Sequence, residues 1–229
     1  MDDMTRYAIY YCPDNGGFAS AAASWLGYDC VSGRDIAQTQ LGDLPRSFAD
    51  ITADPRKYGF HGTIKAPFRL ADGVAIGDLA QAVKLLASQC KPVAVPGLQM
   101  INLEGFLAFV PTGDSTDLNT FAAEVVRSLD PYRADLTEAE IAKRQPDRLT
   151  PRQRDLLAIY GYPFVIEEFR FHLTLSGQMT DAEHHIVAPA AGAHFKGHVP
   201  EPFLLSQICL MIENAQGRFQ LLHRYGLTG

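Results

Sequence analysis

The chain of 229 residues is poor in cysteine, and no part of it is a long apolar run. Its four cysteines lie far apart and include no Cys-x-x-Cys pair: Cys12, Cys30, Cys90 and Cys209. Such spacing indicates reduced thiols and not a disulfide framework. No segment resembles a signal peptide and none reaches membrane-spanning length, so we expect a cytoplasmic protein without a membrane contact.

Positive charge is also scarce, because 20 Lys and Arg residues face 26 Asp and Glu residues, for a formal net charge of -6. This balance argues against a protein that binds duplex nucleic acid through a broad basic surface, although it leaves room for a local cationic pocket. The composition is otherwise that of a globular protein, with 47% hydrophobic and 20% charged residues. The length suits one large domain or two small lobes.

Two short stretches, 60–64 and 171–175, carry the same pattern of Phe-His-x-Thr followed by an aliphatic residue. Each lies in a run typical of a strand, in which successive side chains alternate between the two faces. The predicted polar faces carry His61, Thr63 and Lys65 in the first strand, and Arg170, His172, Thr174 and Ser176 in the second. Two such strands side by side would bring two imidazoles and two hydroxyls into one small space.

These side chains suit phosphoryl transfer without a metal. A neutral and a cationic imidazole, His61 and His172, can take a proton from water and give one to a departing alkoxide near pH 7. The hydroxyls of Thr63 and Thr174 would hold the non-bridging phosphate oxygens and stabilise their charge. We therefore predict that these four residues are catalytic.

Six further side chains are candidates for substrate binding: Lys65, Arg170, Ser176, Tyr7, Tyr11 and Trp25. Each of the two cations could instead be a solvated charge at a strand end. The three aromatic side chains could stack on a sugar or base, or they could fill the core.

Four histidines late in the chain suggest a metal site: His184, His185, His194 and His198. Gly192, Gly197 and Pro200 argue against a helix that would hold the last two in register. No Cys or Asp cluster nearby completes a coordination shell. We expect surface histidines, and neither a metal nor another cofactor.

The pattern of apolar residues predicts alternating helices and strands. Strands are expected over 6–12, 48–52, 93–103, 106–111, 163–177, 204–214 and 218–225, besides the first motif strand. Helices are expected over 18–28, 78–89 and 118–129, within 132–160, and from 180 until the chain weakens near 189–192. Thr137, Thr150 and Thr180 each begin a capping signal. The segment 132–160 is either a connector, which we favour, or a lid over a site.

The same order of elements follows both motifs, namely a helix, an apolar strand, a turn with Gly and another strand. Met100-Ile101 lies 39 residues after His61, and Met211-Ile212 lies 39 residues after His172. Matched motifs at matched spacing indicate a duplication.

This duplication predicts an α+β fold with largely antiparallel sheets around a central cleft. The whole chain, 1–229, would form a single bilobal domain. Its first lobe would span about 48–129 and its second about 163–229, with a helical connector over 130–162.

Two His-x-Thr strands about half a chain apart resemble those of the two-histidine phosphoesterase superfamily. The longer runs at 58–68 and 171–177, with Trp25-Leu26-Gly27 upstream, look like the branch associated with phosphonate metabolism and encoded near carbon–phosphorus lyase genes. The resemblance spans most of the chain and is loosest over 130–160.

This resemblance implies a bilobal, metal-independent enzyme that acts on cyclic phosphodiesters. Carried over to this sequence, it makes His61 and His172 the acid/base pair, and Thr63 and Thr174 the hydroxyls that hold the phosphate. The phosphonate association implies a small ribose cyclic phosphate, such as 5-phosphoribosyl 1,2-cyclic phosphate. We therefore expect a cyclic phosphodiesterase with a small-molecule substrate and no extended nucleic-acid surface.

Two other functions fit the same motifs. The first is RNA end-processing at a 2′,3′-cyclic phosphate, which an acidic chain without a basic–aromatic strip does not favour. The second is a non-catalytic module that binds a sugar phosphate or nucleotide. Intact histidines disfavour this module, because Arg or Lys would bind phosphate equally well.

Overall fold

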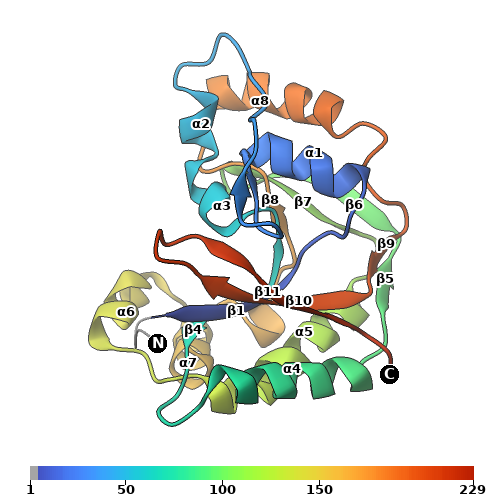
Figure 1. The fold of residues 1–229 in the computed structure, drawn as a ribbon. Coiled ribbons are helices and arrows are strands. Elements are labelled where there is room, and N and C mark those ends of the chain that lie inside the picture. Colours follow the sequence, from blue (N-terminus) through green and yellow to red (C-terminus); the bar gives the residue numbers. More distant parts are fainter. Residues whose placement is uncertain (1–4) are drawn as a thin grey trace.

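The central sheet has seven strands, in the order β11-β10-β1-β4-β8-β7-β6, in the computed structural model, which describes residues 5–229 (Figure 1). All of its neighbouring strands pair antiparallel. The strands are β1 (Arg6–Tyr11), β4 (Gly62–Arg69), β6 (Gly97–Leu103), β7 (Phe106–Thr112), β8 (Leu173–Thr174), β10 (Gln207–Glu213) and β11 (Phe219–Gly226). The predicted α+β class with largely antiparallel sheets is confirmed.

Two antiparallel ribbons accompany this sheet. One pairs β2 (Tyr28–Asp29) with β3 (Arg34–Asp35), and the other pairs β5 (Val93–Val95) with β9 (Phe203–Leu205). The second ribbon joins the two halves of the predicted duplication, because β5 follows the first motif and β9 follows the second. The order β4-α4-β5-β6-β7 is matched by β8-α8-β9-β10-β11. The predicted lobe boundaries themselves stay a prediction.

Helices lie on both sides of the strands, with α1 and α8 together on one side and α4 and α5 on the other (Figure 1). The α-helices are α1 (Gly17–Leu26), α2 (Phe48–Ile51), α3 (Ala53–Tyr58), α4 (Ile76–Gln89), α5 (Thr116–Ser128), α6 (Glu138–Lys143), α7 (Pro151–Tyr160) and α8 (Asp181–His194). Three short 3₁₀ helices are η1 (Asp130–Tyr132), η2 (Pro146–Arg148) and η3 (Ile166–Glu168). Over residues 5–229, no helix combines the length and apolar character that a membrane span requires.

Strand β1 is buried on both of its faces, which explains its nearly continuous apolar sequence. Tyr7, Ile9 and Tyr11 belong to the main hydrophobic core. Ala8 and Tyr10 belong to a smaller cluster on the opposite face of the strand. The functional site described below borders that smaller cluster.

Three predicted helix starts are confirmed. Thr137, Thr150 and Thr180 each cap a helix, and each hydroxyl accepts a hydrogen bond from the backbone N–H three residues later. This cap satisfies one of the amide groups that a helix start leaves without a partner.

The predicted strand over 48–52 is wrong, because this segment is the helix α2. The Ser47 hydroxyl accepts a hydrogen bond from the Asp50 N–H at 3.1 Å and so caps the first turn. The predicted strand over 93–103 is divided between β5 and β6, which lie in different sheets. Pro96 separates them, since proline has no N–H to donate to a ladder.

The predicted strand over 163–177 is also wrong for most of its length. Only Leu173 and Thr174 form strand β8, and η3 precedes them. The backbone at Ile166 has a φ of 57°, which interrupts any extended run. The helix expected to weaken near 189–192 instead continues through Pro189 to His194.

Candidate functional site

The two motifs lie side by side at the centre of the sheet. Gly62 of β4 pairs with Leu173 of β8 in an antiparallel register. Continued by one residue in each direction, this register sets His61 opposite Thr174, and Thr63 opposite His172. The two histidines are then diagonal neighbours on one face, a relationship that spans roughly 7–8 Å in antiparallel sheets.

Two adjoining pockets open on this face. The first pocket has a volume of about 740 Å³ and is lined by His61, Thr63, Thr174 and Ser176 among others. The second pocket, of about 530 Å³, is lined by His172 and Arg170. Thr63, Phe106 and Tyr162 line both pockets. The structure therefore gathers the polar residues of the two motifs at one place on the sheet, but it divides the histidines between two pockets.

The His61 ring is fixed by three contacts. Its Nδ1 lies 2.9 Å from the Gly59 carbonyl, so Nδ1 carries the proton, and its Nε2 lies 3.1 Å from the Thr63 hydroxyl, which donates. The ring also stacks on Tyr10. Burial lowers the pKa of His61 from 6.5 to about 4, an effect that the nearby His172 reinforces. His61 is thus a neutral imidazole at pH 7.

His172 repeats part of this geometry. Its Nδ1 lies 2.8 Å from the carbonyl of Arg170, two residues earlier, as His61 does with Gly59. Both rings therefore carry the proton on Nδ1 and leave Nε2 as the second functional atom. The ring of Phe106 lies beside His172, with a centroid distance of 5.8 Å.

Lys65 and Arg170, the two cations predicted to contact the substrate, differ in burial and in the pocket that they line. The Lys65 ammonium is buried and donates to Asp130 at 3.1 Å and to the Val126 carbonyl at 3.2 Å, so a phosphate contact would have to compete with this pair. Burial lowers the pKa of Lys65, although Asp130 opposes this effect. Arg170 is exposed, 3.5 Å from Glu104, and lines only the second pocket.

Ser176 lines the first pocket, and its hydroxyl already makes two hydrogen bonds within the protein. The hydroxyl accepts a hydrogen bond from the Leu107 N–H and donates one to the Gly177 carbonyl, both at 2.9 Å. The side chain therefore holds β7 against the end of the second motif.

Of the two alternatives for Tyr7, Tyr11 and Trp25, the structure supports core packing and not stacking on a sugar, because all three are in the hydrophobic core. Trp25 is fully buried and its indole N–H donates to the Leu175 carbonyl at 3.0 Å. The ring of Tyr11 packs edge-on against Phe203. These aromatic side chains pack in the main hydrophobic core, on the face of β1 opposite Tyr10.

The aromatic residues beside His61 are Tyr10 and Tyr58, which the sequence analysis missed. The alternation along β1 carried the signal for Tyr10. Tyr7 and Tyr11 lie on one face, so Tyr10 must lie on the other. Nothing in the local sequence indicated Tyr58, which reaches His61 from the end of α3.

Six cationic side chains line the first pocket: Arg6, Lys65, Arg69, Arg133, Lys143 and Arg144. Four of them form ion pairs, Arg6 with Glu213, Arg69 with Glu140, and both Lys65 and Arg133 with Asp130. No local motif encodes this group, because its members come from distant parts of the chain.

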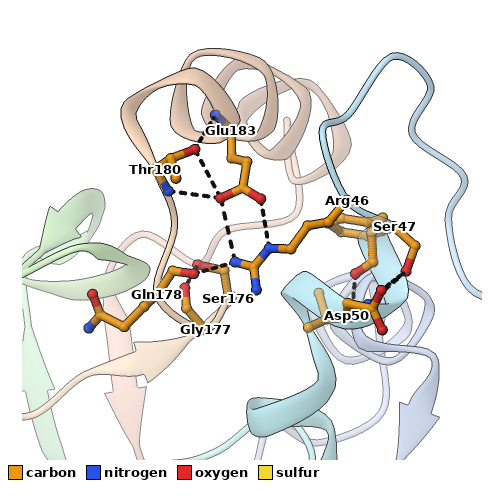
Figure 2. Close-up of polar contacts among 10 residues, drawn as sticks. Arg46, Ser47, Asp50, Ser176, Gly177, Gln178, Thr180 and Glu183 are labelled. Atoms are coloured by element: carbon orange, nitrogen blue, oxygen red, sulfur yellow. Dashed lines mark hydrogen bonds and ion pairs between the residues drawn. The ribbon is translucent and has the colours of Figure 1, made fainter.

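One wall of the first pocket is anchored by a polar network (Figure 2). Arg46 binds the Glu183 carboxylate at 2.6 Å and also donates to the Gln178 carbonyl. The Gly177 N–H donates to the Ile51 carbonyl at 2.7 Å. The backbone N–H of Thr180 and the Arg46 guanidinium together lower the pKa of Glu183. This network fixes the segment that follows the second motif.

The four late histidines do not form a metal site in this structure. His194 ends α8 and lies 2.8 Å from the Ala21 carbonyl, whereas His198 lies beyond the helix. His194 is half-buried beside Trp25, so the expectation of a surface histidine is wrong for this residue. Within residues 5–229, no group of three or more His, Cys, Asp or Glu side chains is arranged to hold a metal ion.

A family model described as "Protein of unknown function (DUF1045)" matches residues 63–220. The chain belongs to this family. It is 36% identical over 203 residues to "Ribose 1,5-bisphosphate phosphokinase PhnN" of Janthinobacterium sp. (strain Marseille), over 86% of this chain and 45% of that protein. It is 29% identical over 219 residues to the protein of the same name from Laribacter hongkongensis (strain HLHK9), over 93% of this chain and 49% of that protein.

The chain therefore spans about half the length of these curated relatives. PhnN is a phosphonate-metabolism protein, so the resemblance to a family of phosphonate metabolism is confirmed.

Among solved structures, the chain is similar to a phosphoesterase, with a TM-score of 0.44, 15% identity and coverage of 98% of this chain and 99% of that chain. It is also similar to E. coli LigT complexed with NADP+, with a TM-score of 0.45, 14% identity and the same coverage. These likenesses concern the fold alone.

The names of the relatives overturn the predicted cyclic phosphodiesterase. Both relatives are named as phosphokinases of ribose 1,5-bisphosphate, which is a different reaction from the hydrolysis of a phosphodiester. The prediction failed because the His-x-Thr motifs indicate how a phosphate is held. The acceptor of the phosphoryl group is not encoded in them, and one fold can carry several reactions.

Proposed function

We propose that the chain binds a phosphorylated ribose in the first pocket and holds it as the phosphoryl acceptor in a ribose 1,5-bisphosphate phosphokinase. The observation that carries this proposal is the cationic lining of the first pocket beside the two motifs. Its volume of about 740 Å³ is in the range of small-molecule sites. The activity itself is that named for relatives of twice this length.

The charge of the pocket supports a phosphate ligand. Six cationic side chains line it against three acidic ones, Asp54, Glu140 and Glu213, although the chain as a whole has a net charge of -6. Arg binds phosphate through paired N–H donors, and Lys binds it as a compact point charge. A local excess of positive charge on an acidic protein favours a small anion over a nucleic acid.

The motif side chains supply neutral hydrogen bonds beside this charge. The Thr174 hydroxyl can donate to a phosphate oxygen. The Thr63 hydroxyl now donates to Nε2 of His61; when it turns to a phosphate oxygen instead, Nε2 becomes free to accept from a sugar hydroxyl. The rings of Tyr58 and Phe106 also line the pocket and offer apolar surface to a sugar ring.

A kinase acceptor site of this kind requires no general base. A phosphate ester with a second pKa of about 6 is already largely ionised at pH 7. The site then needs to position the acceptor oxygen and to neutralise charge. The neutral state of His61 and the cationic lining meet these two needs.

The first pocket does not fit the donor side of the reaction. The sequence contains no G-x-x-x-x-G-K-[ST] loop, which cradles nucleotide phosphates in many kinases. Its three carboxylates are ion-paired, Asp54 with Lys57, Glu140 with Arg69 and Glu213 with Arg6, so they do not form a ligand set for magnesium. We therefore assign to this pocket the sugar phosphate only.

Calorimetric titration of the chain with ribose 1,5-bisphosphate, ribose 5-phosphate and ribose tests the proposal. We expect both phosphates to bind and ribose not to bind. Thr63→Val and Thr174→Val should each weaken phosphate binding by about tenfold, since each removes one hydrogen bond to a charged group. Thr120→Val, an exposed threonine on α5, is the matched control. Absence of phosphate binding, or equal binding of ribose, would refute the assignment.

Phosphoryl transfer is tested separately by adding ATP and magnesium to the chain with ribose 1,5-bisphosphate. Formation of ADP together with a new diphosphate signal in the phosphorus NMR spectrum would show that the chain also binds the phosphoryl donor, outside the first pocket. Binding without transfer would reject the kinase reaction for this chain and leave the sugar-phosphate site standing.

A further inference from the structure

Lys143 and Arg144, at the end of α6, differ from the other cations of the first pocket. The remaining four are ion-paired with Asp130, Glu140 or Glu213. Over residues 5–229, the structure contains no ion pair for Lys143 or Arg144. These two side chains therefore carry the positive charge of the pocket that no neighbouring carboxylate neutralises.

Arg144 is held in place by an aromatic ring. Its guanidinium carbon lies 4.8 Å from the ring centre of Tyr162, which itself packs edge-on against Phe164. Tyr162 lines both pockets, so the guanidinium lies at the wall of the site. A guanidinium stacked on a ring keeps its N–H groups free at the edge for a bidentate contact with phosphate.

The position of α6 is also fixed. Glu140 on this helix pairs with Arg69 of β4 at 3.0 Å, and its carboxylate caps the helix by accepting from the Thr137 N–H. The helix ends where Gln145 takes a φ of 49°, in the left-handed region. Lys143 and Arg144 are thus presented by a helix tied to the same strand that carries the first motif.

An anion that binds at the end of α6 breaks no existing ion pair. At Lys65 or Arg133, by contrast, a phosphate would have to compete with Asp130. The electrostatic gain from phosphate binding is therefore expected to be largest at Lys143 and Arg144. The same pocket is lined by His61 and Thr174, so both places open into one cavity.

We infer that Lys143 and Arg144 form a second phosphate subsite, and that the first pocket takes a small sugar with two phosphate groups. The first phosphate is held at the two motifs and the second at the end of α6. This inference rests on the proposed sugar-phosphate function and specifies its ligand class. It also names Arg144 as a residue that distinguishes bisphosphates from monophosphates.

Cations at the C-terminus of a helix also stabilise the helix dipole, and this is the structural alternative for both residues. A purely structural role would alter stability, or would alter the affinity for every ligand alike. The ratio of bisphosphate to monophosphate affinity responds to the second subsite alone, so that ratio is the appropriate measurement.

The experiment titrates the chain with ribose 1,5-bisphosphate, fructose 1,6-bisphosphate and ribose 5-phosphate. For Arg144→Gln we expect the bisphosphate affinity to fall by about tenfold or more while the monophosphate affinity stays within about twofold. Lys143→Gln should have a smaller effect of the same kind, and Arg144→Lys should recover part of the loss. Arg148→Gln, an exposed arginine on η2, is the control and should match the wild type. Thermal melting confirms that each variant is folded.

Equal loss of mono- and bisphosphate binding in Arg144→Gln, or no loss at all, would overturn the second subsite. If the wild type binds ribose 1,5-bisphosphate no tighter than ribose 5-phosphate, the subsite is also refuted, but the proposed function stands. If fructose 1,6-bisphosphate depends on Arg144 whereas ribose 1,5-bisphosphate does not bind, the subsite stands and the proposed function is refuted.

Discussion

The ring of His61 stacks on Tyr10 with centroids 3.9 Å apart and planes inclined by 28°. Tyr10 pairs with Thr63 across the β1–β4 ladder, so the stack follows from strand register. The contact excludes water from one side of the imidazole, and burial disfavours its charged form. The motif histidine is consequently a neutral group whose protonation opposes folding.

We expect the stability of the protein to fall between pH 6.5 and pH 4 because of His61. Its pKa is lowered from 6.5 to about 4, so the unfolded chain binds the proton more readily than the folded chain in this range. The stabilisation is present above pH 6.5 and is lost as the pH falls toward 4, with a full size of up to about 3 kcal/mol. Urea unfolding at a series of pH values measures it.

The matched variants are His61→Gln, which cannot titrate, and His185→Gln, which removes an exposed histidine of α8. The first should flatten the dependence between pH 6.5 and pH 4, and the second should retain it. Parallel curves for His61→Gln and the wild type would show that the pKa of His61 is the same in the folded and the unfolded chain.

Replacing Tyr10 by Phe is expected to maintain or raise stability, by about 1 kcal/mol at most. The Tyr10 hydroxyl is buried and has no hydrogen-bond partner among residues 5–229, so its removal loses no bond and avoids a desolvation cost. The stack with His61 survives because the ring remains. Tyr10→Leu removes the ring and should let the pKa of His61 rise toward 6.5.

An NMR titration of the His61 ring in both variants checks this prediction, with thermal unfolding as the second readout. A clear loss of stability in Tyr10→Phe would mean that the hydroxyl is hydrogen-bonded in solution. An unchanged His61 titration in Tyr10→Leu would assign the low pKa to other neighbours.

The parts of the fold that the sequence predicted are those encoded by local chemistry. Thr137, Thr150 and Thr180 begin helices because a hydroxyl and a nearby amide are enough to define a cap. The apolar residues of segment 48–52 fit the period of a strand and that of a helix, and the cap at Ser47 decides in favour of the helix. The prediction of a strand over 163–177 is wrong because tertiary packing, with a left-handed backbone at Ile166, overrides the strand propensity of this segment.

The candidate site likewise has a part that local sequence predicts and a part that it does not. The alternation within each motif correctly set His61 and Thr63 on one face of the sheet. The remaining lining, such as Arg144 above Tyr162, depends on contacts between segments that are distant along the chain, and no local pattern encodes them. The motifs do not determine the reaction class, because the same groups can bind phosphate in hydrolysis and in phosphoryl transfer.

Removing the guanidinium of Arg46 is expected to destabilise the protein by about 1–3 kcal/mol and to weaken sugar-phosphate binding. Arg46→Met leaves the buried Glu183 carboxylate without its cation, and it frees the Gln178 carbonyl in the pocket wall. Glu183→Gln should have a smaller effect, because its side chain can still accept from the Thr180 N–H. Thermal unfolding and titration with ribose 5-phosphate measure both consequences.

The double variant Arg46→Met/Glu183→Gln distinguishes a specific pair from two separate losses. Its cost should be less than the sum of the single costs, with a coupling of about 0.5–3 kcal/mol. Arg34→Met, an exposed arginine earlier in the same segment, is the control. Additive effects would show that Figure 2 depicts neighbours that do not stabilise each other.

The last prediction concerns the attachment of α6 through Glu140. The hydrogen bond from Arg69 is the main cause that lowers the pKa of Glu140 from 4.5 to about 2. Because the folded pKa is depressed, the attachment contributes its full stability above pH 4.5 and loses it as the pH falls toward 2. Glu140→Gln removes the charge at every pH.

In Glu140→Gln at pH 7 we therefore expect faster tryptic cleavage after Lys143 and Arg144 than in the wild type, since a loosened helix exposes its backbone to the protease. Glu138→Gln, on the same helix but without an ion pair to β4, is the matched control and should be cleaved at the wild-type rate. The affinity for ribose 1,5-bisphosphate should fall in Glu140→Gln, because Arg144 is no longer held at the wall of the first pocket. Wild-type cleavage together with wild-type affinity in this variant would show that α6 is fixed by contacts other than the pair of Arg69 and Glu140.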